Sequence, residues 1–104
     1  IVEKAVAKLK KLDSLLKSKG YKHLIYISPT KKQVVEKASK DIVLENLLKN
    51  NKLNVTYISN KIEALTLSPK EKQNLFHDNV HLTEKGHLLW GRLIEKKLKE
   101  IIYN

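Results

Sequence analysis

The sequence predicts a fold of the α/β class, in which helices cover a parallel sheet. Two segments, 23–28 and 53–59, are rich in β-branched and aromatic residues, as buried strands are. Amphipathic helical patterns precede, separate and follow them, and this alternation is typical of parallel strands joined by helical crossovers. The chain has 104 residues, which is enough for one modest domain and too few for two.

An amphipathic helix is predicted over residues 2–19, because apolar side chains recur there every three or four positions and lysines fill the opposite face. Gly20 then supplies the residue type that ends helices in a left-handed conformation. The strand at 23–28 follows. Its nearly continuous apolar character predicts that both of its faces are covered.

A second helical region is expected to begin near Lys31, because Pro29 breaks the strand and Thr30 is a good helix cap. Its apolar stripe is formed by Val34, Val35, Ala38, Ile42, Val43, Leu47 and Leu48. Ser39 and Asp41 could divide this region into two helices. Asn50 and Asn51 end it, and the alternating segment 53–59 forms the second strand.

The C-terminal third carries two further helix starts. Ser68-Pro69-Lys70-Glu71 combines a capping box with proline at the first helical position, which predicts a short helix toward Leu75. After a loop at 76–82, Thr83 caps the last helix. This helix is expected to bury Leu89, Trp90, Leu93, Ile94, Leu98, Ile101 and Ile102. Gly86, near its start, is expected to permit close backbone packing.

The composition limits the classes of partner. Lys and Arg total 21 against 11 Asp and Glu, a formal charge of +10, and 41% hydrophobic residues are too many for a disordered tail. Arg92 is the one arginine and the lysines are spread along the chain, so we expect solvated helix faces and no specific nucleic-acid partner. A small basic module that binds nucleic acid or another polyanion is the alternative. The apolar runs are too short for a membrane span, and without cysteine there is no disulfide or thiolate zinc site.

Two parallel strands are too few for a stable sheet with three or four helices, because both edges stay open. Either the chain pairs with a second copy through a strand edge, or residues 1–104 are the trailing part of a larger doubly wound domain. The start at Ile1 in place of methionine favours the second interpretation.

Reactive side chains gather in the segment 76–87, between the last strand and the last helix. Loops in this position border the crevice at the carboxyl ends of parallel strands. Asp78, three residues before His81, can turn back and accept the Nδ1–H of the imidazole, which leaves Nε2 free as a base. Alternatively, Asp78 only caps a turn and His81 packs against the helix. A metal site of His77, His81, His87 and Asp78 is less favoured, because the two histidines at 77 and 81 precede the helix start.

The block from Asp78 to His87 reads Asp-x-x-His-Leu-Thr-x-x-Gly-His and is followed by a long amphipathic helix. It resembles the last conserved block of the SGNH (GDSL) hydrolase family. The preceding helix, strand, helix and strand are similar to the later course of that family. The resemblance implies a three-layer α/β/α flavodoxin-like fold, of which this chain would hold only the trailing part with about two parallel strands and three to four helices.

The resemblance further implies a serine esterase or O-acyl hydrolase or transferase without a cofactor. His81 would be the general base and Asp78 the carboxylate that orients it. The chain departs from the family because it has no Gly-Asp-Ser, no glycine block and no Gly-x-Asn-Asp block. None of its serines lies in the required context, at positions 14, 18, 28, 39, 59 and 68. The nucleophile is therefore expected from a missing N-terminal half or a separate chain, and the substrate would be an ester or O-acetyl group. Residues 78 and 81 could also belong to a catalytically inactive fragment.

Overall fold

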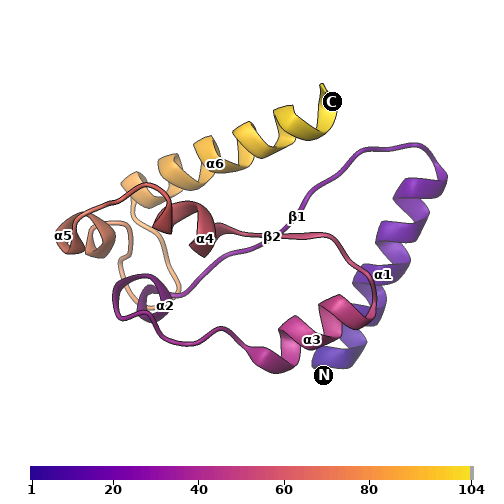
Figure 1. The fold of residues 1–104 in the computed structure, drawn as a ribbon, viewed down its shortest axis with the longest axis horizontal. Helices are drawn as coiled ribbons and strands as arrows, with labels where there is room; N and C mark the ends of the chain where they lie inside the picture. The colour runs from indigo at the N-terminus through magenta and orange to yellow at the C-terminus, as the bar shows by residue number, and fades with distance from the viewer. Residues whose placement is uncertain (104) are drawn as a thin grey trace.

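The computed structural model describes residues 1–103, over which the chain forms six helices and a two-stranded parallel sheet (Figure 1). The α/β class is thus confirmed, while the expected three to four helices are too few. In chain order the elements are α1 (Val2–Ser18), β1 (Ile25–Ile27), α2 (Lys31–Val35), α3 (Ile42–Asn50), β2 (Val55–Tyr57), α4 (Ile58–Glu63), α5 (Pro69–Gln73) and α6 (Glu84–Ile102). None of the helices in this part of the chain is long and apolar enough to cross a membrane.

The two strands are shorter than the sequence predicts. They pair in parallel over three positions, with Ile25 opposite Val55 and Ile27 opposite Tyr57. The prediction that both faces of β1 are covered is wrong, because Tyr26 keeps 43% of its surface exposed. Since the sheet of the described residues contains β1 and β2 alone, each strand has one unpaired edge.

Helix boundaries follow the local capping signals. The α1 helix ends before Gly20, whose φ of 77° lies in the left-handed region. The second helical region is split into α2 and α3, because Lys37 takes a φ of 56° and the Asp41 carboxylate caps α3 by accepting the Leu44 N–H at 3.1 Å. The predicted apolar stripe is not buried at the first turn of α3, where Ile42 and Val43 are 65% and 61% exposed.

The α4 helix lies where the sequence predicts the end of the second strand. Ile58 and Ile62 stand one turn apart on it and are each only 1% exposed. Burial of these two side chains, each worth about 1.5–3 kcal/mol, outweighs the β preference of the Tyr57-Ile58 sequence. The α4 helix also contacts α6, so it joins the sheet to the C-terminal helix.

Ser68 and Thr83 cap α5 and α6 as predicted. Ser68 forms the capping box with Glu71, and the Thr83 hydroxyl accepts the Gly86 N–H at 3.1 Å. Among the predicted apolar residues of α6, only Trp90 is buried. The prediction for Ile102 is wrong, since this residue is 50% exposed. The remaining predicted positions of α6 are partly buried.

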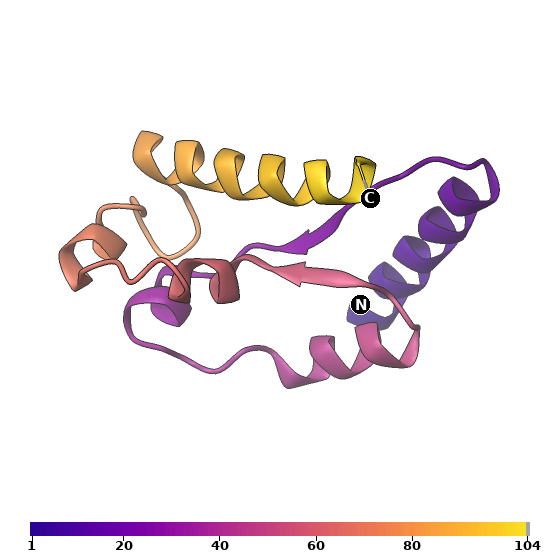
Figure 2. The ribbon, with the colours of Figure 1, turned by 45° about the horizontal axis from the view of Figure 1, so that its top comes forward.

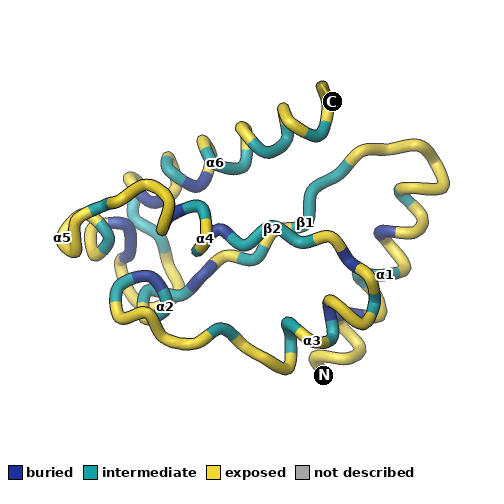
Figure 3. The backbone as a smooth tube through the Cα atoms, viewed as in Figure 1, coloured by how far each residue is buried: buried dark blue, intermediate teal, exposed yellow. Residues whose placement is uncertain are grey.

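Buried side chains form two clusters. Figure 3 marks the buried positions along the backbone in dark blue. The larger cluster joins α2, α4, α6 and the segment that follows α5, through Val34, Ile58, Ile62, Leu75, Phe76 and Trp90. The smaller one joins α1 and α3 to one face of the sheet through Val6, Leu48 and Leu53, with Ile25, Ile27 and Val55 against them. Figure 2 shows α6 on one side of the strands and α2 and α3 on the other.

Asp13 of α1 is a charged residue that is buried, at 3% exposure. Its Oδ1 lies 2.7 Å from His23 Nε2 and its Oδ2 lies 3.1 Å from Lys17 Nζ. Burial opposes ionisation of the carboxyl, but the hydrogen bonds from His23 and Lys17 outweigh it and lower the pKa of Asp13. These contacts fix the end of α1 to the segment that leads into β1.

Replacement His23→Ala should destabilise the fold by about 2–3 kcal/mol, because it leaves a buried carboxylate with Lys17 as its remaining partner. The measurement is the urea midpoint of unfolding at pH 7, with exposed His77→Ala as the control. Because the pKa of Asp13 is lowered on folding, its contribution is present above the unfolded pKa and falls as the pH drops below about 4. Equal midpoints for the two variants at pH 7 would contradict the assignment.

Candidate active site

The segment between α5 and α6 turns back on itself and is closed at its base by backbone pairing. Phe76 and Leu82 form an antiparallel bridge, and the His77 N–H donates to the His81 carbonyl oxygen at 2.8 Å. The Thr83 N–H donates to the Leu75 carbonyl oxygen at 3.0 Å. Phe76 is buried at the base, whereas residues 77–81 are exposed. The loop therefore presents its tip from a rigid base.

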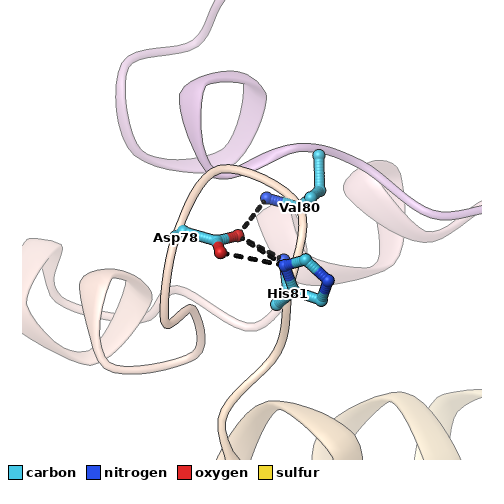
Figure 4. A network of polar contacts seen from close by, with 3 residues as sticks. All are labelled: Asp78, Val80 and His81. Atoms are coloured by element: carbon cyan, nitrogen blue, oxygen red, sulfur yellow. Dashed lines mark hydrogen bonds and ion pairs between the residues drawn. The ribbon is translucent and has the colours of Figure 1, made fainter.

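Asp78 and His81 face each other across this loop (Figure 4). His81 Nδ1 lies 3.0 Å from Oδ1 and 2.9 Å from Oδ2 of Asp78. Oδ1 also accepts the N–H groups of Val80 at 2.9 Å and of His81 at 2.8 Å. A proton on Nδ1 is thus fixed by the carboxylate, and Nε2 is left with a lone pair that can accept a proton. The predicted pairing of Asp78 with His81 is present.

A cavity of about 540 Å³ opens beside this pair. It is lined by Ser28, His77, Asp78, Val80, His81, Leu82 and His87. Ser28 directly follows β1, so the cavity lies at the carboxyl end of a parallel strand, where open α/β sheets place their ligands. The volume falls within the range of small-molecule sites.

Ser28 is a cavity residue to which the sequence alone assigns no role. Its Oγ accepts the Nε1–H of buried Trp90 at 2.9 Å, across 62 positions of sequence. The Trp90 ring is itself held edge-on against Phe76, with 5.8 Å between ring centroids. Ser28 could have been predicted as a cavity residue from its position after a strand and before Pro29, since residues at carboxyl strand ends line such crevices.

The other histidines of the segment are spread around the cavity. His77 and His87 both line it and are exposed. Among the described residues, no three His, Cys, Asp or Glu side chains come close enough together to hold a metal ion. Trp90, by contrast, is a core residue at 5% exposure, as the apolar pattern of the last helix indicates.

Local hydrogen bonding lowers the pKa of Asp78 to about 2. The backbone N–H groups of Val80 and His81 are the main causes, and the His81 side chain adds to them. Asp78 therefore stays a carboxylate over the whole range in which a histidine changes its charge. Its share of stability is present above the unfolded pKa and is lost as the pH falls toward 2.

A carboxyl ¹³C titration of the chain should place the Asp78 midpoint near 2, below the ordinary aspartate value of 3.8. In His81→Ala the midpoint should rise only part of the way, because the two backbone donors remain. A midpoint at the ordinary value in the unmodified chain would mean that the Asp78 oxygens do not accept these bonds in solution.

Asp78 and His81 thus form a pair with one free imidazole nitrogen, at the mouth of a cavity beside the end of β1. Neither acid nor base comes from the strands themselves, since both lie on the loop before α6. No protein-family model, curated protein or solved structure matches the chain, so the geometry of this loop and cavity is the basis for assigning a function.

Proposed function

We propose that this chain is the C-terminal part of an SGNH/GDSL-type serine esterase or O-acyl hydrolase or transferase, in which Asp78 and His81 are two members of a Ser-His-Asp triad. The observation that carries the proposal is the hydrogen bonding of His81 Nδ1 to Asp78 at 2.9–3.0 Å, which leaves Nε2 available as a base. The block from Asp78 to His87 supports it by its resemblance to that family.

The reaction would proceed through an acyl-enzyme. His81 Nε2 accepts the proton of a serine hydroxyl while the serine oxygen attacks the ester carbonyl carbon. When the bond to the alcohol breaks, His81 returns this proton to the leaving oxygen. A water molecule then gives a proton to His81 and attacks the acyl carbon, and the serine oxygen leaves with that proton. In acyl transfer, an acceptor hydroxyl takes the place of water.

The serine would come from polypeptide outside residues 1–104, either a leading half of the same protein or a separate chain. The unpaired edge of β1 supports this, since a further parallel strand can bond there. A largely apolar cavity of about 290 Å³ lies between α1 and β1. Leu12 and Tyr26 line it and are 51% and 43% exposed. Covering these side chains would also enclose the sheet.

The exposure of the pair supports the same proposal. The His81 and Asp78 side chains are 74% and 59% exposed, and an ion pair this open contributes little to stability. The two carboxylate oxygens that contact Nδ1 and the two backbone donors to Asp78 are therefore better explained by orientation of the imidazole for chemistry. The substrate class is an ester or O-acetyl group, as on a glycan or lipid, and the proposed steps require no cofactor.

Assay of the complete protein with p-nitrophenyl acetate, together with labelling by a fluorophosphonate, tests the proposal. We expect ester hydrolysis and one labelled serine outside residues 1–104. Absence of both in the folded complete protein would indicate the inactive alternative. Salt-sensitive binding of a polyanion in place of hydrolysis would instead indicate a basic binding module.

A further inference from the structure

The loop that carries Asp78 and His81 is joined to the rest of the molecule at its tip as well as at its base. Asn79 stands between the two residues of the pair. Its backbone oxygen accepts the Lys31 N–H at 2.8 Å, and its Oδ1 accepts the Lys32 N–H at 3.1 Å. Within the described part of the chain, these are the hydrogen bonds that join residues 77–82 to an element outside this loop and its flanking helices.

The partner of Asn79 is the first turn of α2, where backbone donors need acceptors from outside the helix. Thr30 satisfies one of them, because its Oγ1 accepts the Gln33 N–H at 3.2 Å. The backbone N–H groups of Lys31 and Lys32 have no acceptor within the helix, and Asn79 supplies one to each. The two caps therefore come from different places: Thr30 is local, whereas Asn79 is 47 residues away in sequence.

We propose that Asn79 is a positioning residue that fixes the Asp78–His81 pair by docking the tip of its loop on the first turn of α2. This rests on the proposed function for its catalytic consequence. The pairing at 76 and 82 restrains only the base of the loop, whereas the exposed side chains of Asp78 and His81 lie on either side of Asn79. The α2 helix in turn follows Ser28 and Pro29 at the end of β1. Asn79 thus sets the loop against the end of the strand that borders the cavity.

Amide order parameters from ¹⁵N relaxation of the chain test the docking. Asn79→Ala removes the Oδ1 acceptor, and we expect the values at Val80 and His81 to fall from about 0.85 to below about 0.6. Asn79→Asp keeps an oxygen toward the helix N-terminus and should restore them. The matched control is Thr30→Ala, which removes the other cap of α2 without touching the loop and should leave both values unchanged.

In the complete enzyme, Asn79→Ala should lower kcat for p-nitrophenyl acetate by roughly ten- to a hundredfold with KM within about twofold, as expected for a misplaced base. The positioning role is overturned if the loop stays ordered in Asn79→Ala, if Thr30→Ala disorders it equally, or if kcat is unchanged. If the complete protein shows no esterase activity at all, the proposed function fails, while the order parameters still decide whether Asn79 docks the loop.

Discussion

His81→Ala should lower kcat/KM for ester hydrolysis by the complete protein by roughly 10⁴-fold or more, because in the proposed mechanism it removes the group that accepts the serine proton and later returns it. Asp78 cannot take over this role. Its pKa of about 2 makes its carboxylate a very weak base near neutral pH, and its oxygens already accept two backbone N–H groups. The measurement is the steady-state rate with p-nitrophenyl acetate, together with the rate of fluorophosphonate labelling.

His77→Ala is the matched control for this loss. His77 lines the same cavity and is exposed, and the bond from its backbone N–H to the His81 oxygen survives the substitution. Its activity should stay within a few-fold of the unmodified protein. Thermal unfolding should be the same for both variants, because both side chains are exposed. Ester hydrolysis that persists at its full rate in His81→Ala would exclude His81 as the base.

Gly86→Ala should give the largest loss of stability among single substitutions near the site, about 2–3 kcal/mol or more. A Cβ on Gly86 would overlap the Leu75 carbonyl oxygen and stand 3.1 Å from Leu82 Cβ. The Leu75 carbonyl is backbone, already accepts the Thr83 N–H and cannot swing away as a flexible side chain would. The first turn of α6 would have to move away from the base of the loop.

Gly91→Ala is the matched substitution on the same helix. Apart from its chain neighbours and the backbone of its own helix, nothing lies within 4 Å of a Cβ at Gly91, so alanine there should stabilise α6 by up to about 1 kcal/mol through its higher helix propensity. Urea unfolding at pH 7 measures both variants. The expected signs are opposite. A neutral or stabilising Gly86→Ala would show that α6 does not pack on the Leu75 carbonyl as described.

Features with local causes could be predicted from the sequence. Gly20, Ser68 and Thr83 each act on backbone within three residues, so their roles can be seen in the sequence alone. The pairing of Asp78 with His81 is of the same kind, since a three-residue turn brings the carboxylate back to the imidazole. The three-layer fold and membership of the SGNH/GDSL family stay predictions.

Features set by distant partners could not be predicted. The β-branched run into Ile58 favours a strand, and only the burial of Ile58 and Ile62 in the larger cluster makes it α4. Asp13 meets His23 from a different element. Ser28 and Asn79 find their partners 62 and 47 residues away, so neither contact leaves a periodic or motif signal in the sequence.

The unpaired edge of β1 also bears on the colloidal behaviour of the isolated chain. An open strand can recruit copies of itself into stacked aggregates, but β1 offers only three residues for such growth. A formal charge of +10 on each copy adds mutual repulsion that acts over about 10 Å at 0.1 M salt. At low ionic strength the isolated chain should therefore stay unaggregated. At high salt the lysine charges are screened, and aggregation through the strand edges should begin.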